Sequence, residues 1–276
     1  QIMDDALPYL MRGLRHVSTD SSVLVSSSKY LNNPKLRDWV ATNMLRRSGK
    51  DRPPTADTYE LHLIMKEIQD RDHVDALFEQ ERQRNPQLDA WLSERFMSSL
   101  SVKDVQACAP DTLGGTFHRE VIEKGYSIEI MPPLPEPPKS HLDYYMMRNG
   151  QTHDFEHILT GGGLDFIGEL VPYYARLVNV FKHLSPELAG ELSVFNILGA
   201  MRIMSRGMLH YPQTWPAIVD AMERGIAVGG ASDPIFMIKC EDALHLPLDV
   251  ARERLGIRDA RFVDTSAETA FYLEQV

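Results

Sequence analysis

Apolar residues recur along this chain at the three- and four-residue spacing of amphipathic helices. The first hundred residues show no two-residue alternation, which is the pattern typical of half-buried strands. Helices are therefore expected at residues 2–17, 36–47, 59–67, 72–82, 86–97, 164–183 and after Ser140, Ser185 and Trp215. The sequence predicts an all-α fold.

Prolines divide this pattern. Pro53-Pro54 ends the N-terminal stretch, and residues 131–138 (MPPLPEPP) form an extended connector that we interpret as a strap across one domain. We predict a helical N-terminal extension at 1–54, a single multi-helix domain at 55–258 and a C-terminal tail at 259–276. With 276 residues, 43% of them hydrophobic, the chain can bury a core of this size.

The stretch from His153 to Glu169 carries the candidate chemistry. On a helix, His153, Asp154 and His157 share one face, because each residue advances by about 100°. Glu169 is expected inside a second, strongly apolar helix, where an unpaired carboxylate would be costly. A divalent cation bound by all four side chains would supply the partner. The sequence leaves one alternative open, an exposed polar face with Glu169 paired to an arginine.

Three glycine-containing segments each predict a local feature of the backbone. Residues 160–163 (TGGG) predict a turn between the two helices, with the second helix starting near Leu164. Asn149-Gly150 predicts that the preceding helix kinks or ends just before His153. Gly114-Gly115 do not form a GxGxxG motif after a strand, so we interpret them as a place of close packing rather than a phosphate cradle.

Charge and cysteine content narrow the function classes. A formal net charge of -10 argues against a nucleic-acid binder, which needs a basic stripe. The basic run Leu45–Arg52 is interpreted as a solvated helix end, and contact with a membrane surface or an acidic partner remains open. Cys108 and Cys240 lack CxxC spacing, so neither a zinc ribbon nor a disulfide framework is indicated. No uninterrupted apolar run approaches the ~20 residues of a membrane span.

The two apolar helices after the motif offer more apolar surface than a small core needs. The surplus predicts a cavity for a long hydrocarbon ligand or a partner interface, with plain core packing as the simpler alternative. Arg202 and Arg206 are four residues apart and could clamp a phosphate or carboxylate.

The motif resembles a known signature. His153-Asp154-Phe155-Glu156-His157, eleven residues and then Glu169 are similar to the HDxxH-x11-E signature of the Coq-four family of ubiquinone (coenzyme Q) biosynthesis proteins. Arg148 falls where that family has an arginine upstream of the motif. The resemblance extends from about residue 57 to 257 and includes the segments DTLGGTF at 111–117, ILGAMRI at 197–203 and LPLDVARERLGI at 246–257.

The resemblance implies a divalent metal, usually zinc, held by His153, Asp154, His157 and Glu169, with Asp154 also catalytic. Arg148 and Arg202 are then candidate substrate-binding residues. It also implies an apolar lipid cavity and oxidative decarboxylation at C1 of a polyprenyl hydroxybenzoate. Implied partners are other quinone-biosynthesis proteins and a membrane surface, at the bacterial inner membrane from the cytoplasm or the mitochondrial inner membrane from the matrix. Because zinc has no redox chemistry, iron, manganese or cobalt remain open.

Two other functions compete with this one. A non-catalytic scaffold would hold the lipid and organise a quinone-biosynthesis complex around a structural metal, as a monomer or a homo-oligomer. A zinc peptidase would place a glutamate where this chain has Asp154, one methylene shorter. The scaffold is the stronger rival.

Overall fold

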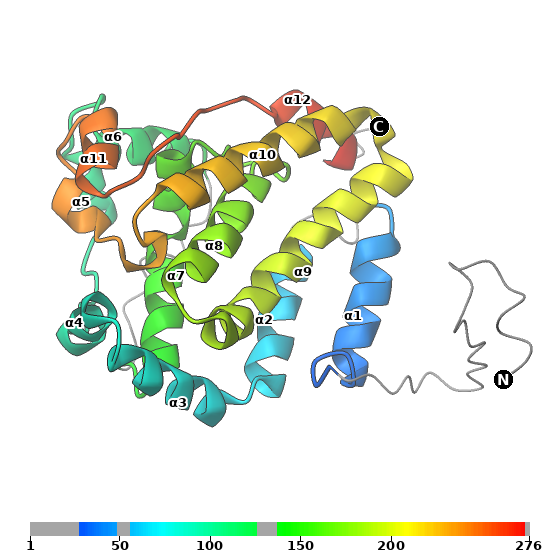
Figure 1. Cartoon of the computed structure of the whole chain (residues 1–276). Helices are drawn as coiled ribbons and strands as arrows, with labels where there is room; N and C mark the ends of the chain where they lie inside the picture. The colour runs from blue at the N-terminus through cyan, green and yellow to red at the C-terminus, as the bar shows by residue number, and fades with distance from the viewer. Residues whose placement is uncertain (1–27, 49–55, 126–136, 274–276) are drawn as a thin grey trace, which may run out of the picture.

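The computed structural model describes residues 28–48, 56–125 and 137–273, and helices dominate them, with no extended strand in these ranges (Figure 1). The expectation of an all-α fold is therefore confirmed. The α-helices are α1 (Pro34–Leu45), α2 (Ala56–Ile68), α3 (Arg71–Arg82), α4 (Pro86–Glu94), α5 (Val102–Gln106), α6 (Leu113–Phe117), α7 (His141–Thr160), α8 (Leu170–His183), α9 (Pro186–His210), α10 (Trp215–Ala231), α11 (Leu248–Arg254) and α12 (Ser266–Leu273).

Side-chain caps set the start of several helices. Asp70, Asn85 and Ser140 each accept a hydrogen bond from the backbone N–H three residues on, at 3.0–3.1 Å. Arg95 takes a left-handed φ of 48° and ends α4 at Glu94, three residues before the predicted end. The helix predicted at 2–17 and most of the connector at 131–138 lie outside the described residues.

One expected interruption is wrong, because α7 runs through Asn149-Gly150 without a break. The glycine is exposed, and a mid-helix glycine costs only about 1 kcal/mol relative to alanine. Its neighbours Arg148, Gln151 and Thr152 are buried against the rest of the molecule. Tertiary packing therefore outweighs the local turn preference.

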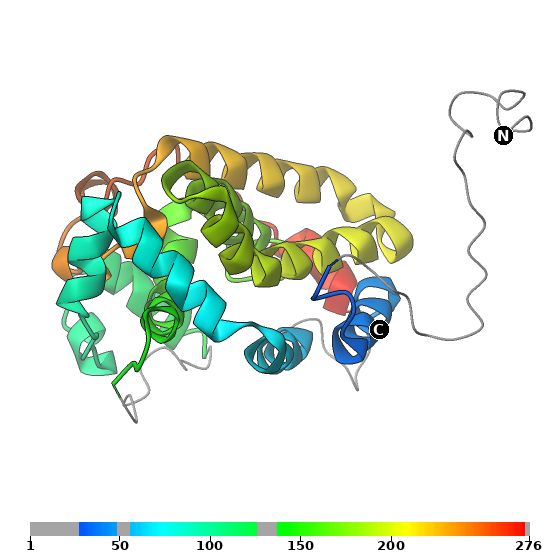
Figure 2. The ribbon, with the colours of Figure 1, turned by 60° about the horizontal axis from the view of Figure 1, so that its bottom comes forward.

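The long helices form the body of the molecule. Helix α8 packs against α7, α9 and α10, and the views in Figures 1 and 2 place α10 along one side of it. Helix α1 packs on α2 and α9 through Leu36, Trp39 and Met44, so the described part of the N-terminal extension joins the core. The segment predicted as a tail contains α12, whose Tyr272 is buried. The division into 1–54, 55–258 and 259–276 stays a prediction.

None of the helices in the described ranges has both the length and the apolar character needed to span a bilayer.

Gly114-Gly115 mark a close approach, as interpreted from the sequence. A Cβ at Gly115 would stand 1.9 Å from the carbonyl oxygen of Ala109, and one at Gly114 would stand 2.4 Å from Sγ of Cys108. The pair therefore lets α6 lie directly against the preceding turn.

Gly115→Ala should lower the free energy of unfolding by about 1–3 kcal/mol, because the added methyl group overlaps backbone that cannot move away. Gly150→Ala is the matched control: nothing lies within 4 Å of its added Cβ, and alanine should stabilise α7 by about 0.5–1 kcal/mol. Urea denaturation of both variants measures the difference. Equal stabilities of Gly115→Ala and the wild type would contradict the packing interpretation.

Candidate metal centre

The centre is built at a helix–turn–helix junction. His153 and His157 lie one turn apart near the end of α7, which stops at Thr160. Gly161 then takes a left-handed φ of 83° and donates its N–H to the His157 carbonyl at 3.0 Å, which is a common way to end a helix. The predicted turn is therefore present, and it brings the chain back toward the two imidazoles.

Glu169 stands at the N-cap of α8, so the prediction that it lies inside the second helix is wrong. The residues before it form turns instead of helix, because Oδ1 of Asp165 accepts the backbone N–H groups of Ile167 at 3.2 Å and Gly168 at 3.0 Å. The helix starts six residues later than expected.

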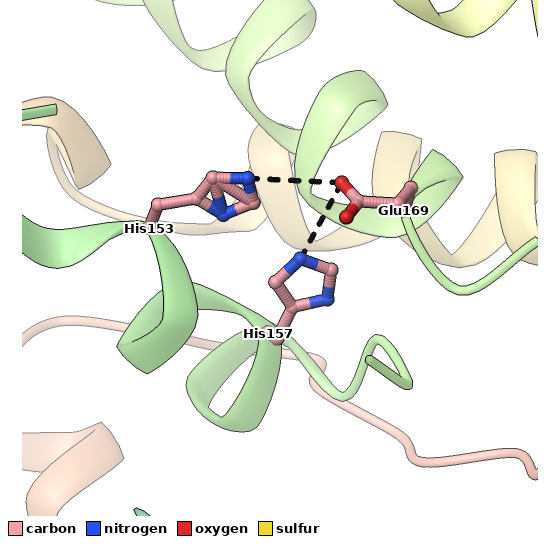
Figure 3. Close-up of side chains that lie close together, drawn as sticks. All are labelled: His153, His157 and Glu169. Atoms are coloured by element: carbon pink, nitrogen blue, oxygen red, sulfur yellow. Dashed lines mark ion pairs between the residues drawn. The ribbon is translucent and has the colours of Figure 1, made fainter. Parts of the chain in front are cut away.

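Two imidazoles and one carboxylate converge at this junction (Figure 3). Oε2 of Glu169 lies 3.7 Å from Nε2 of His153 and 3.5 Å from Nε2 of His157. The two rings stack with centroids 4.9 Å apart and planes 8° from parallel. The three potential ligand atoms lie within 4.8 Å of one another. We call these three residues the triad.

The two separations from Glu169 are compatible with a metal ion. Ligands at about 2.0–2.1 Å from a tetrahedral zinc stand roughly 3.3–3.4 Å from each other, close to the distances of 3.7 and 3.5 Å from Glu169 to the two histidines. Nε2 of His157 and Oε2 of Glu169 are buried without a hydrogen-bond partner, which is costly unless a cation or a proton shared between them is present. Two histidines and one carboxylate also form the ligand set of non-haem iron sites.

The turn orients one of the ligands. Nδ1 of His157 lies 2.8 Å from the Gly163 carbonyl oxygen, which can only accept, so Nδ1 carries the proton and donates it. In the neutral ring Nε2 then keeps its lone pair and faces Glu169. Metal-bound histidines are commonly held in this way by a carbonyl group.

In the protein without metal, His157 and Glu169 stabilise each other's charged forms. Burial would raise the pKa of Glu169, but the neighbouring His157, His153 and Arg202 lower that pKa to about 2. Burial would lower the pKa of His157, but Glu169, Asp154 and the Gly163 carbonyl raise it to about 9. A metal at this site must displace the proton from His157.

Asp154 is the fourth predicted ligand, and the structure places it beside the triad. Its Oδ1 lies 3.9 Å from Nδ1 of His153, the ring nitrogen that faces away from Glu169. Burial raises the pKa of the Asp154 carboxyl, partly offset by the two histidines. The structure thus brings together three of the four predicted ligands, and the role of Asp154 stays a prediction.

The two predicted substrate-binding arginines are buried and engaged within the protein. Arg148 donates to both carboxylate oxygens of Glu241, at 3.1 and 3.2 Å, and to the carbonyl of Ile238 at 3.1 Å. Arg202 donates from Nε to Oδ1 of Asp57 at 3.1 Å and from Nη1 to the Gly199 carbonyl at 2.6 Å. A contact of either arginine with substrate stays a prediction.

The residue pair that joins the two helices of the centre is not among the predicted site residues. Glu156, within the motif, forms a bidentate ion pair with Arg176 on α8, including a bond of 2.7 Å from Nε to Oε2, and both side chains are buried. Thr152 donates to Oε1 of the same carboxylate at 2.7 Å. A glutamate within the motif of α7 and an arginine within the apolar helix α8 were the available signals.

A cavity of about 580 Å³ is lined by His157 of the triad and by Gly163 of the turn. Its wall mixes apolar side chains, such as Leu164 and Phe262, with charged ones, such as Arg252. The volume suits a small molecule, whereas the predicted apolar lipid cavity stays a prediction.

Comparisons with known proteins bear on the fold. Neither the models of known protein families nor the curated proteins match this chain. Among solved structures, a protein from Nostoc punctiforme, provisionally named as a ubiquinone biosynthesis protein, has a similar fold with a TM-score of 0.54 and 20% sequence identity. The likeness covers 74% of this chain and 89% of the other.

Proposed function

We propose that this protein takes part in ubiquinone biosynthesis and carries out the metal-dependent oxidative decarboxylation of a polyprenyl hydroxybenzoate at C1. The observation that carries the proposal is the triad, in which two buried ligand atoms, on His157 and Glu169, face each other without a hydrogen bond. The fold likeness to a protein provisionally named for ubiquinone biosynthesis and the resemblance of the motif to the Coq-four signature support the pathway.

In this reaction the bond from C1 to the carboxylate breaks and CO₂ leaves. One oxygen atom of O₂ becomes the new hydroxyl group, and the other is reduced to water by two electrons from an external donor. A bound divalent cation would polarise the ring oxygens or carboxylate of the precursor. His157 and Glu169 would hold the cation from the protein side, while His153, whose side chain is 43% exposed, leaves a side open to substrate. Asp154 would exchange a proton with the substrate.

The scaffold remains the second candidate function, with a structural metal and no turnover. One observation favours the enzyme over it. Structural zinc sites are usually closed by four protein ligands, whereas catalytic sites have three and an open position. The triad supplies three candidate ligands, and Oδ1 of Asp154 lies 3.9 Å from Nδ1 of His153, whose Nε2 is the nitrogen that faces Glu169.

Elemental mass spectrometry on protein purified without an affinity metal tests the site directly. We expect about one divalent metal per chain. His157→Ala and Glu169→Ala should each weaken metal binding by at least about 100-fold, because each removes one of three ligands. His141→Ala, at the far end of α7 and paired with Glu79, is the matched control and should keep the metal. Folded wild-type protein that contains and binds no divalent metal would refute the metalloenzyme proposal.

Asp154→Asn distinguishes the enzyme from the scaffold. If Asp154 transfers a proton, the variant should fold and keep its metal but lose roughly 10²–10⁴-fold in turnover of a prenylated hydroxybenzoate. The measurement is product formation by mass spectrometry, beside metal content and circular dichroism. A variant that has full turnover, or that loses its metal or its fold, would contradict the catalytic assignment.

A further inference from the structure

The cavity of about 580 Å³ beside His157 lies apart from the open side of the triad. Its wall comes from four parts of the chain: residues 116–124, 157–165, 248–252 and 262–266. His153 and Glu169 do not contribute to this wall, and His153 is the exposed member of the triad. Nε2 of His157 and Oε2 of Glu169, which face each other in Figure 3, are buried. The cavity is therefore a second site, separate from the side at which the precursor would meet a metal.

Arg252 on α11 presents a firmly held guanidinium to this cavity. Its Nε donates to the Leu159 carbonyl and its Nη2 to the Ile158 carbonyl, each at 3.0 Å. Its Nη1 donates to Oδ1 of Asp249 at 3.1 Å, but the Asp249 side chain is 94% exposed, so this ion pair contributes little. Within the described residues these bonds use three of the five N–H groups, which leaves one on each Nη atom for a ligand.

The other charged side chains of the wall are compensated by their surroundings. Nε of Arg119 donates to Glu120 at 3.0 Å, and Lys124 pairs with the same carboxylate. Asp165 accepts hydrogen bonds from two threonine hydroxyl groups and two backbone N–H groups, and Asp264 is exposed to solvent. Arg252 is therefore the cation of this wall whose partner a ligand can displace at the lowest cost.

Apolar side chains form the rest of the wall. Ile158, Leu164, Leu248 and Phe262 line the cavity, and the Phe262 side chain is among the most exposed large apolar ones, at 63%. A ligand that covers this ring would remove apolar surface from water. The cavity volume also falls within the range of about 300–1,000 Å³ that is typical of small-molecule sites.

We propose that this cavity binds a small carboxylic acid with an apolar body, in its ionised form. The carboxylate accepts N–H groups of Arg252 in place of Asp249, and the apolar body lies against Leu164, Leu248 and Phe262. A singly charged anion suits this wall better than a phosphate dianion, because three acidic side chains also line the cavity. The inference goes beyond the proposed function and does not depend on it, since neither His153 nor Glu169 lines the cavity.

Isothermal titration calorimetry on the full chain tests this site with three probes: benzoate, its neutral isostere benzamide, and inorganic phosphate. Benzoate should bind at least about tenfold more tightly than benzamide, because only the carboxylate forms charge-assisted hydrogen bonds with Arg252. Phosphate should bind more weakly than benzoate.

Variants on two sides of the cavity locate the bound acid. Arg252→Gln should weaken benzoate binding by about tenfold or more, since it removes the cationic donor. Phe262→Glu should weaken it as well, because it removes apolar contact and adds a like charge, and the exposure of Phe262 makes the change safe for the fold. Arg254→Gln, at an exposed position on the same helix, is the matched control and should bind benzoate as the wild type does.

The Glu169→Ala variant separates this site from the metal centre, because a carboxylate could also bind a metal ion there. It should bind benzoate as the wild type does, whether or not either protein holds metal. Loss of benzoate binding in this variant would place the acid at the triad and overturn the inference. The same conclusion would follow if benzoate failed to bind the wild type, if benzamide or phosphate bound as tightly, or if Arg252→Gln and Phe262→Glu both left benzoate binding unchanged.

Discussion

Replacing Glu156 by leucine should lower the free energy of unfolding by about 3–5 kcal/mol, because it leaves the buried Arg176 guanidinium without its counter-charge. Burial disfavours that charge, and the bidentate carboxylate, with a smaller contribution from Tyr145, offsets the penalty. The two residues join α7 to α8, the helices that carry the triad, so metal affinity should fall as well. Urea denaturation and metal titration measure the two effects.

The double variant Glu156→Leu/Arg176→Leu is the control for this prediction. With both charges removed, burial of two apolar side chains should recover most of the lost stability. Recovery of stability without recovery of metal affinity would show that the ion pair positions the triad. If Glu156→Leu alone remains within about 1 kcal/mol of the wild type, the pair does not hold the helices together.

The second large effect is expected at Asp57, a buried carboxylate on α2 shared by two buried arginines. It accepts hydrogen bonds from Nε of Arg202 at 3.1 Å and from Nη2 of Arg206, and Arg46 lies 3.9 Å away. Burial, followed by the effect of Arg46 and Arg202, lowers the pKa of Arg206 to about 10. Asp57→Asn should therefore lower the free energy of unfolding by about 3–5 kcal/mol, since it removes the negative charge among three cations.

Thermal unfolding provides the measurement, and a loss of this size should lower Tm by roughly 10 °C in a chain of this length. Asp38→Asn, an exposed aspartate on α1, is the matched control and should change stability by less than about 0.5 kcal/mol. Equal Tm values for the two variants would contradict the expectation that Asp57 compensates the charge of the buried arginines. Arg202 also lies near Glu169. Without the charge of Asp57, Arg202 can turn toward the Glu169 carboxylate and compete with a cation, so the Asp57→Asn variant should also bind metal more weakly.

Local patterns predicted most of the helices and three of the residues that meet in the centre. His153 and His157 are one turn apart in any helix, and the three consecutive glycines at 161–163 strongly favour a turn. The apolar content of the segment predicts Glu169 deep inside its helix, because it gives no sign of the turn that Asp165 forms by accepting the backbone N–H groups of Ile167 and Gly168. Asn149-Gly150 failed as a break because buried neighbours hold α7 together.

Local sequence patterns do not predict ion pairs between distant parts of the chain. Arg148 pairs with Glu241, which is 93 residues away in the sequence, and Arg202 pairs with Asp57, which is 145 residues away. The resemblance implies that both arginines bind substrate, and it gives no indication of these partners within the chain. The C-terminal ends of α9 and α12 lie beside each other, and this too depends on tertiary packing, which no local pattern encodes.

The turn at residues 161–169 has a consequence for the order of folding. Both helices of the centre, the Glu156–Arg176 pair and all three residues of the triad lie within residues 141–183, so forming them closes only short loops. Contacts of such low sequence separation form fast compared with those that join α1 or α2 to α9. The helical hairpin can therefore assemble before the N-terminal helices pack.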